Sequence, residues 1–339
     1  MKVAIIYSGG ELTTQQPEDY KGRNDEGNLQ DVMNALTSLN HEVVKVDANE
    51  SIFQRLLELK GQVDVLFNLA EEGYNLDIGT EPHMAALFEM LGFKFTGSNY
   101  LCLASCLDKA RAKQLFVVNG LSTPNFMIFN KEINPDVKIN GLKFPLIVKP
   151  GKSDGSVGIR RNSVVEDVEQ LVLKVNEIIQ TYEPPALVEE FIDGREVNVG
   201  ILGNKRLTVL PMSEIIFNLP PEEWNFVPYE AKWLTKTKYY KGTTPKCPAE
   251  IEPELKDEIE ELAKKAYTLM GVRGFGRVDF RIDANNKPYI LEVNPNPDIS
   301  RDAGLARMIQ AHGMTYEELI EKILRMGINK DDQELRILI

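Results

Sequence analysis

The chain has 339 residues, of which 43% are hydrophobic and 27% are charged, and its formal net charge is −12. This length predicts two or three domains rather than one small core, and the composition is typical of a soluble globular protein. The negative charge argues against a nucleic-acid-binding protein, which would carry a basic surface, but it leaves room for a small nucleotide held by local lysines.

The cysteine content and the lengths of the hydrophobic runs indicate the cellular compartment in which we expect the protein. The three cysteines, Cys102, Cys106 and Cys247, are too few and too scattered for a disulfide framework, which favours a reducing compartment. No apolar run approaches the ~18 residues of a membrane span, and residues 1–10 fit a buried first strand better than a signal peptide. We therefore expect a cytoplasmic protein without a membrane partner.

Strand and helix patterns alternate in the N-terminal part of the chain. The strand patterns cover residues 2–7, 42–47, 63–69 and 94–97, and the helix patterns cover residues 28–40, 52–61 and 81–92. This alternation predicts a parallel sheet that helices cover on both faces. Ligands of such sheets collect where the strands end, which indicates the loops at residues 8–11 and 70–75.

The middle of the chain follows a different pattern. Strands are predicted at residues 144–150, 158–163, 186–192 and 196–203, with one helix at residues 165–180. An irregular stretch at residues 219–248 precedes a long amphipathic helix that Pro253 opens and Gly271 ends. Such a mixture predicts α+β architecture after the N-terminal α/β part.

Residues 276–294 predict a β-hairpin with turn formers in the middle. The apolar residues that alternate along its two strands are Val278, Phe280, Ile282, Tyr289, Leu291 and Val293. If these apolar faces coincide in an antiparallel pair, Val278 lies opposite Val293, Phe280 opposite Leu291 and Ile282 opposite Tyr289.

The opposite face of this hairpin is polar. The same register places Asp279 opposite Glu292 and Arg277 opposite Asn294. Two carboxylates ~5 Å apart repel each other unless a cation lies between them. Oxygen ligands of this kind suit Mg²⁺, which also binds substrate phosphates. A solvated polar face is the alternative, and the hairpin alone leaves both open.

A glycine-rich loop follows the strand that delivers Lys149. Its small residues are Gly151, Gly155, Ser156 and Gly158. Small residues let backbone N–H groups approach phosphate oxygens, and a neighbouring lysine offsets their charge. A Walker-type phosphate loop is excluded because Leu146 occupies its first glycine position and a strand pattern follows. A plain turn is the alternative reading.

Six motifs occur in one order along the chain. They read LDKARAK, FPLIVKP with the glycine-rich loop, ALVEEFIDGREVNV, YEAKWL, GFGRVDF and ILEVNPNP. This series resembles the ATP-grasp enzymes and is similar to their D-alanine–D-alanine ligase group over nearly the whole chain. The resemblance implies an α/β and α+β fold, with an N-terminal parallel-sheet domain at residues 1–98 before a two-lobed ATP-grasp fold at residues 99–190 and 191–335.

The resemblance also implies the ligands and their residues. We expect ATP with two Mg²⁺ ions, a role that Mn²⁺ can also fill. The lysines would contact phosphates, residues 189–192 would read adenine, and Glu196 would hold the ribose. The implied ATP contacts are Lys109, Lys149, Ser156, Glu189, Glu190, Phe191, Ile192, Glu196 and Lys232. The implied metal ligands are Asp279, Glu292 and Asn294. The implied catalytic residues are Arg277, Lys149, Gly155 and Ser156.

Members of this group phosphorylate a carboxylate and let an amine attack the acylphosphate, which releases ADP and phosphate. The resemblance therefore implies small-molecule carboxylate and amine substrates, no nucleic acid, and a homodimer by analogy. A genuine D-alanine–D-alanine ligase is one alternative. A non-catalytic ATP-binding module is another, although such a module would not need the arginine at 277.

Several positions depart from the group's pattern. A serine, a tyrosine and a second serine of the group are replaced here by Gly155, Trp233 and Ala303. The group's N-terminal glutamate has only candidate equivalents, namely Glu11, Asp25 and Glu26. Because these losses fall on amino-acid binding, we expect a kept reaction with a changed substrate. Glu71 and Glu72 would bind an ammonium and Arg301 a carboxylate, or all three are solvated charges.

Overall fold

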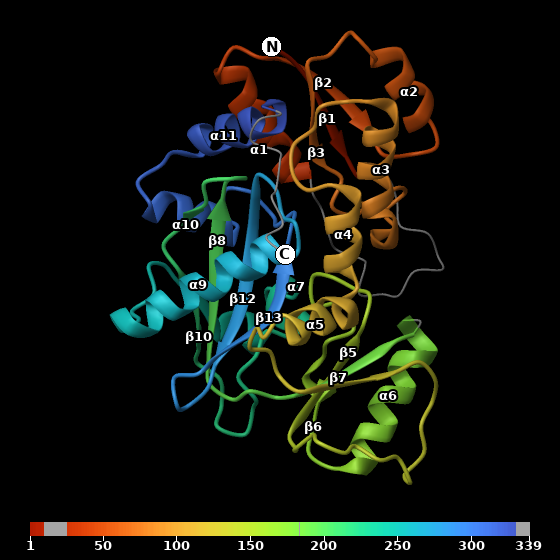
Figure 1. Ribbon diagram of the computed structural model, residues 1–339, viewed down its shortest axis with the longest axis vertical. Helices are drawn as coiled ribbons and strands as arrows, with labels where there is room; N and C mark the ends of the chain where they lie inside the picture. The colour runs from red at the N-terminus through yellow and green to blue at the C-terminus, as the bar shows by residue number, and fades with distance from the viewer. Residues whose placement is uncertain (10–25, 183, 330–339) are drawn as a thin grey trace.

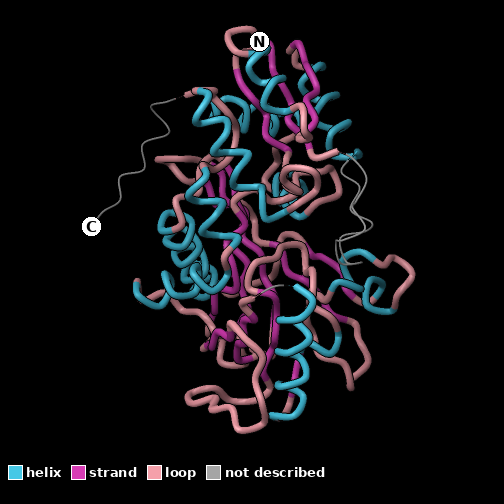
Figure 2. Tube along the Cα trace, turned by 90° about the vertical axis from the view of Figure 1, so that its right-hand side faces the viewer, coloured by secondary structure: helices cyan, strands magenta, loops and turns pink. Residues whose placement is uncertain are grey.

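The computed structural model describes residues 1–9, 26–182 and 184–329, and these residues form three sheets. Figure 1 shows the sheets as tiers, with the N-terminal sheet at the top, the largest sheet in the middle and the third sheet at the bottom. Figure 2 shows the same tiers from the side. The two antiparallel sheets and several helices contribute residues to the site described below, so their packing decides its geometry.

The N-terminal sheet is parallel, as predicted. Its strands are β1 (Lys2–Tyr7), β2 (Glu42–Asp47) and β3 (Val65–Leu69), in the order β2-β1-β3. Its helices are α1 (Glu26–Ser38), α2 (Ile52–Leu59) and α3 (Glu81–Leu91). Apolar residues of α1 pack on one face of the sheet, and those of α2 and α3 pack on the other. The predicted strand at 94–97 is wrong, because Gly97 has a φ of +82° and only the Leu66–Phe95 bridge forms.

A four-stranded antiparallel sheet follows two connecting helices. The helices are α4 (Tyr100–Leu107) and α5 (Lys109–Val118). The strands are β4 (Phe126–Phe129), β5 (Leu146–Pro150), β6 (Val164–Val165) and β7 (Ala186–Glu190), in the order β4-β7-β5-β6. Apolar residues of α6 (Val168–Tyr182) pack against it.

The predicted strand at residues 158–163 is also wrong. Arg161–Ser163 forms a short 3₁₀ turn (η3) instead, and pairing begins only at Val164. Ser163 explains the difference, since its hydroxyl accepts the Arg160 N–H at 2.9 Å while its own N–H donates to the Arg160 carbonyl at 2.8 Å. Local bonds of this kind compete with a strand ladder.

The largest sheet carries the hairpin. Its strands are β8 (Arg195–Leu202), β9 (Thr208–Val209), β10 (Ser213–Phe217), β11 (Thr243–Lys246), β12 (Phe275–Ile282) and β13 (Pro288–Asn294). The main order is β11-β10-β8-β12-β13, with β9 beside β8. Helix α9 (Pro253–Leu269) covers one face, and α10 (Gly304–Ala311) packs at Gly200 on the other. The stretch predicted as irregular also contains the short helices α7 (Tyr229–Trp233) and α8 (Lys238–Lys241).

The hairpin register agrees with the prediction only at the end that carries the polar residues. Asp279 pairs with Glu292, but the register shifts immediately after Asp279, so that Phe280 pairs with Ile290 and Ile282 with Pro288. The predicted pairing of Phe280 with Leu291 is therefore wrong. The shift brings Ile290, which has no exposed surface, into the core and leaves Leu291 half-buried. A bulge of one residue is enough to exchange the two faces of a strand.

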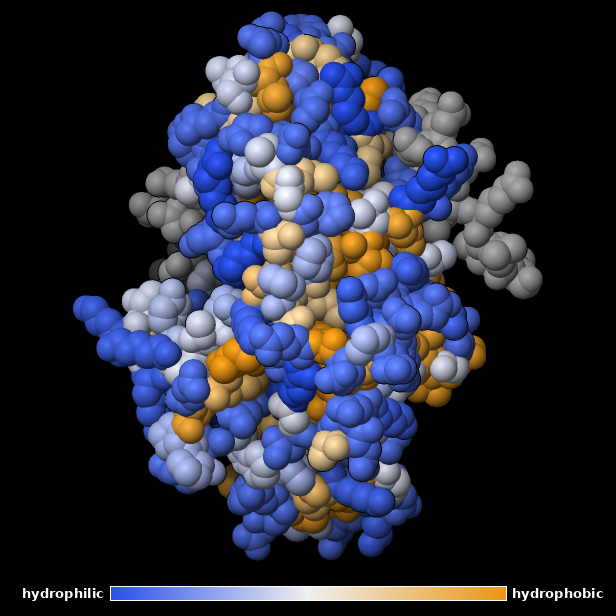
Figure 3. Space-filling view, turned by 90° about the vertical axis from the view of Figure 1, so that its left-hand side faces the viewer, coloured by the Kyte–Doolittle hydropathy of each residue, from blue (hydrophilic) through white to orange (hydrophobic). Residues whose placement is uncertain are grey.

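The last described helix returns to the beginning of the chain. Helix α11 (Tyr316–Ile328) packs against α1 and β3, and Figure 1 shows this blue helix beside the red N-terminal segment. The domain division at residues 98 and 190 stays a prediction. Within the described ranges no helix is long and apolar enough to cross a membrane. The face in Figure 3 is mostly hydrophilic, with hydrophobic residues in separate small groups.

Packing of α11 predicts a sensitive glycine. A Cβ added at Gly327 would lie 2.9 Å from the Phe95 carbonyl oxygen and 3.0 Å from the Thr96 Cα. Because backbone atoms cannot rotate away, we expect Gly327→Ala to lower the free energy of unfolding by about 1–3 kcal/mol. Urea unfolding measures this change. Gly27→Ala is the matched control, since its Cβ meets nothing within 4 Å. Equal stability of the two variants would contradict the packing of α11.

Candidate active site

The polar face of the hairpin forms one connected cluster. Arg277 donates to both oxygens of Asp279, at 2.7 and 2.8 Å. Asn294 donates to Asp279 Oδ2 at 2.9 Å, and Asn198 on β8 donates to Oδ1 at 2.7 Å. With only 7% of its surface exposed, Asp279 depends on these donors. The structure thus brings together Arg277, Asp279 and Asn294 as the sequence predicted and adds Asn198.

Glu292 at the edge of this cluster pairs with the first residue of α5. The Lys109 Nζ lies 2.5 Å from Glu292 Oε2. Burial alone would raise the pKa of Glu292, but Lys109, Lys149 and Arg277 together outweigh it and hold that pKa far below its usual range. Lys109 is itself buried, with 8% exposed. Two residues that the sequence assigned to phosphate and metal are therefore in direct contact.

A second buried cluster lies near Lys109. Glu189 on β7 has no exposed surface and forms ion pairs with Lys149 on β5 and with Lys113 on α5, the latter at 2.5 Å. Burial would raise the pKa of Glu189, yet the two ammonium groups lower it. Burial also lowers the pKa of Lys113 to about 8, against the opposing effect of Glu189. Lys113 was not predicted from the sequence.

Lys113 also connects two sheets. Its ammonium donates to the Thr123 hydroxyl at 2.8 Å and to the Ile290 carbonyl on β13 at 3.1 Å. Thr123 donates to that same carbonyl at 2.7 Å. The network therefore ties the four-stranded sheet to the strand that carries Glu292 and Asn294.

The segment predicted to read adenine begins at the end of β7. The Glu190 carboxylate accepts from Asn125 Nδ2 and from the Lys143 N–H, both at 2.9 Å, so its side chain holds neighbouring loops. Phe191 packs edge-on against Trp224, with 5.3 Å between ring centroids. Glu196 lies 3.2 Å from Arg281, and burial raises its pKa although Arg281 opposes the rise. The adenine and ribose contacts themselves stay predictions.

The glycine-rich loop packs against α7. Trp233 Nε1 donates to the Gly155 carbonyl at 2.9 Å, and the Ser156 hydroxyl donates to the Val227 carbonyl at 3.1 Å. Gly155 and Ser156 have φ angles of +63° and +64°. Two of the positions that depart from the family pattern, 155 and 233, thus contact each other directly.

The remaining predicted residues lie apart from these clusters. Lys232 is exposed and its ammonium lies 5.3 Å from the Trp233 ring centroid. Arg301 is 46% exposed and pairs with Glu317 at 2.6 Å, which favours its reading as a surface charge. Glu72 is buried rather than solvated. Glu11 and Asp25 lie outside the described residues. Glu26 is the first residue of α1, and its side chain is not described.

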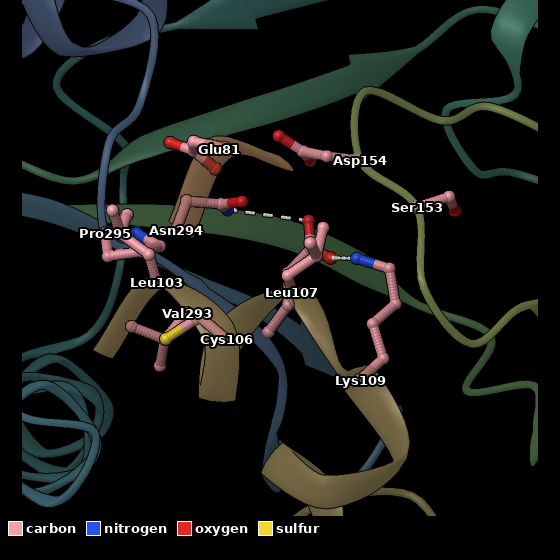
Figure 4. Close-up of a pocket in the computed structure, with 11 residues that line it drawn as sticks. Glu81, Leu103, Cys106, Leu107, Lys109, Ser153, Asp154, Val293, Asn294 and Pro295 are labelled. Carbon is pink, nitrogen blue, oxygen red and sulfur yellow. Dashed lines mark hydrogen bonds and ion pairs between the residues drawn. The ribbon is translucent and has the colours of Figure 1, made fainter. Parts of the chain in front are cut away.

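One pocket opens beside Lys109 and the hairpin (Figure 4). It measures about 320 Å³, a volume that includes space open to solvent. Helices α3 to α5, the glycine-rich loop and β13 all line it. Its lining residues are Glu81, Leu103, Cys106, Leu107, Lys109, Ser153, Asp154, Glu292, Val293, Asn294 and Pro295. Lys109, which we assign to phosphate, and Glu292 and Asn294, which we assign to metal, thus face the same space. Glu81 from the N-terminal part faces it too.

The oxygen-bearing side chains of the hairpin fit Mg²⁺ that arrives with phosphates. Asp279, Glu292 and Asn294 supply two carboxylates and one amide oxygen on one strand pair. Within the described residues no three His, Cys, Asp or Glu side chains gather into a complete metal cage. Mg²⁺ commonly takes one or two carboxylates and completes its shell with water and phosphate. The set is therefore suited to a metal–nucleotide complex rather than to a resident metal.

Lys113 and Glu81 were not predicted as site residues, for different reasons. Lys113 lies one helical turn after Lys109 in the LDKARAK motif, so its spacing was a usable signal. Glu81 precedes a proline at the start of a helix, where an acidic residue is common for local reasons alone.

The buried cluster predicts a specific stability pattern. Lys113→Met leaves the fully buried Glu189 with one cation instead of two, and we expect a loss of about 3–5 kcal/mol in the free energy of unfolding. Lys113→Met with Glu189→Gln should not recover that loss, because the buried Lys149 ammonium then loses its carboxylate partner. Chemical denaturation measures both.

Lys264→Met on α9 is the control, since Lys264 forms only a long surface ion pair of 3.8 Å. It should change stability by less than about 0.5 kcal/mol. A Lys113→Met protein as stable as this control would contradict the structural role of the cluster.

Comparisons with known proteins identify the family of this chain. The family model described as D-ala D-ala ligase C-terminus matches residues 115–325. A D-alanine–D-alanine ligase of Carboxydothermus hydrogenoformans is 32% identical over 305 residues, which are 88% of this chain and 91% of the relative. An uncharacterized protein of Sinorhizobium fredii is 32% identical over 326 residues, or 94% of this chain and 92% of the relative.

Solved structures show the same fold. The D-alanine–D-alanine ligase of Bacillus anthracis complexed with ATP superposes with a TM-score of 0.73 at 21% identity and covers 97% of both chains. The VanG D-Ala:D-Ser ligase of Enterococcus faecalis gives a TM-score of 0.71 at 21% identity, covering 96% of this chain and 99% of that one. The chain therefore belongs to the D-alanine–D-alanine ligase family of ATP-grasp enzymes, which form C–N bonds.

Proposed function

We propose that the pocket beside Lys109 joins the carboxylate of one small molecule to the amine of another at the expense of ATP, and that the substrate is an amino acid or a dipeptide-like compound. The observation that carries this proposal is the convergence of Lys109, Glu292 and Asn294 on one pocket, with Arg277 and Asp279 on the same strand pair. These are the residue types that phosphate, metal and a developing oxyanion require.

The nucleotide would lie between the two antiparallel sheets. Lys109 and Lys149 would hold its phosphates, with Ser156 and Gly155 in the loop above them. The backbone of residues 189–192 would face adenine, since the Glu189 side chain is buried between two lysines. The Phe191 and Trp224 rings would form an apolar wall, and Glu196 would accept from the ribose. Lys232 would approach from the exposed side of α7. The base of the nucleotide thus meets apolar groups, and its charged phosphates meet lysines.

Asp279, Glu292 and Asn294 would hold two Mg²⁺ ions, and Mn²⁺ could replace them. The metal supplies charge neutralisation on the phosphate oxygens when it is bound. Arg277 would steady the incoming substrate and the oxyanion that forms on the carboxylate carbon. The loop at residues 151–158 would exclude water from the acylphosphate. We expect the reaction to take place in the cytoplasm, in a homodimer.

The amino-acid side of the site differs from that of the D-alanine ligases. Gly155 and Trp233 are joined by an indole N–H to carbonyl bond where the family uses hydroxyl groups. Ala303 is a buried helix N-cap without a hydroxyl. These differences favour a substrate other than two molecules of D-alanine. A genuine D-alanine–D-alanine ligase is the second candidate, and the name and coverage of the Carboxydothermus relative favour it.

The first prediction from this proposal concerns the substrate. Purified protein with ATP and Mg²⁺ should release ADP faster with an amino-acid pair other than D-alanine, by about tenfold or more. A coupled assay of ADP release across D-alanine, glutamate, lysine and other carboxylates and amines measures this. Strong D-alanine-dependent release, equal to or above all other additions, would favour the second candidate instead.

The second prediction distinguishes a ligase from an ATP-binding module without catalysis. Arg277→Ala should lower turnover by about 10²-fold or more, because a preorganised cation at the oxyanion is lost. Calorimetric titration with a non-hydrolysable ATP analogue should still detect binding. Arg301→Ala is the control, since Arg301 lies in a surface ion pair. If Arg277→Ala and Arg301→Ala turn over at the same rate, the catalytic role of Arg277 is rejected.

A further inference from the structure

Glu81 is the acidic residue that the N-terminal part contributes to the pocket. It is the first residue of α3, and its Oε1 accepts from Asn296 Nδ2 at 3.1 Å. Figure 4 shows Glu81, Asn294 and Asp154 around one side of the pocket, with Lys109 at the other. The carboxylate thus shares one space with the residues assigned to phosphate and metal.

Glu81 differs from Glu292, Glu189 and Asp279 in the charge of its hydrogen-bond partner. Glu292 pairs with Lys109, Glu189 with two lysines and Asp279 with Arg277. Within residues 1–9, 26–182 and 184–329, the polar partner of Glu81 is the neutral amide of Asn296. A carboxylate in such surroundings either keeps its proton or takes a cation from the ligand.

The surroundings of Glu81 are negative. Burial raises its pKa to about 8; the bond from Asn296 lowers it, and the nearby carboxylates of Asp154 and Glu72 raise it further. Its position in the first turn of α3 favours the ionised form by only about 0.3–1 kcal/mol. This end of the pocket therefore attracts positive charge, whereas the end at Lys109 attracts phosphate.

These observations indicate what the pocket accepts. An amino-acid substrate carries an ammonium group whose charge must be neutralised once it leaves water. We propose that Glu81, held by Asn296, binds the ammonium group of the amino acid whose carboxylate is activated, while the other end of the pocket holds the phosphates. This assignment rests on the proposed function, since it needs an amino-acid substrate. It replaces Glu71 and Glu72, which do not line the pocket.

The test compares Glu81→Gln with a matched control. Glutamine keeps the size of the side chain and its oxygen for Asn296 but loses the charge. Glu89→Gln is the control, because Glu89 lies near the other end of the same helix and is exposed. Both are assayed for ADP release with the amino-acid pair that gives the highest rate in the wild-type protein.

We expect Glu81→Gln to raise the KM of the ammonium-bearing substrate about 10- to 100-fold, because a charge-assisted hydrogen bond is lost. The KM of ATP should stay within about twofold of wild type, and Glu89→Gln should equal wild type in both. In the wild-type protein, the analogue with a hydroxyl in place of the amino group should be a poor substrate. With that analogue, Glu81→Gln and wild type should be equal.

Urea unfolding separates a folding defect from a binding defect. A carboxyl whose pKa is 4.5 unfolded and about 8 folded binds more protons in the folded state, so wild-type stability should fall as pH rises across that range. The groups around it are Asp154, Glu72, Cys102, Cys106, Lys109, Glu292 and Asn296. Glu81→Gln lacks this titration and should be at least as stable as wild type at pH 8.

An active wild-type protein whose KM is unchanged in Glu81→Gln would overturn the assignment of Glu81 and leave the ligase function standing. Equal turnover of the hydroxyl analogue by the wild-type protein would overturn it too, and this measurement does not depend on any variant folding. Absence of ADP release with every amino acid would instead reject the proposed function, together with this assignment.

Discussion

The interaction on which the rest of the site depends is the burial of Glu189 between Lys113 and Lys149. A carboxylate with no exposed surface is costly unless cations meet it, and here they come from α5 and β5. These elements and β7 must therefore keep one relative position. Lys113 extends the constraint to β13 through the Ile290 carbonyl, so that Lys109 and Glu292 meet at the pocket.

Charge balance explains how such a site folds without its ligands. Lys109 neutralises Glu292, and Arg277 neutralises Asp279, before any nucleotide is present. Each acid that we assign to metal is thus paired with a cation that we assign to phosphate or substrate, and ligand binding would exchange partners rather than create new buried charge. Among the described residues, Glu81 meets the neutral amide of Asn296 at this pocket instead of a cation.

The residues that we assign to the reaction and the positions that depart from the family pattern lie on different elements. The residues that we assign to the metal and the oxyanion, together with Lys109, lie on β12, β13 and α5, where register and packing allow little change. The departures lie in the glycine-rich loop, in α7 and at the start of α10. Trp233 and Gly155 show how such departures are coupled, because an indole N–H needs an acceptor and a backbone carbonyl supplies one whatever the side chain. Loops and short helices of this kind tolerate substitution, which lets specificity vary over a constant chemistry.

The sequence by itself determined the periodic features and the ordered motifs. Strand alternation has a period of two, so the residue pattern alone places Asp279 opposite Glu292. Packing decided the bulge after Asp279, because exchanging Leu291 for Ile290 in the core depends on what lies above the strand. Lys113 and Glu189 form an ion pair although they lie 76 residues apart in the sequence. Glu81 and Asn296 form a hydrogen bond across 215 residues. Contacts so distant in sequence are set by how whole sheets pack, and no local pattern records them.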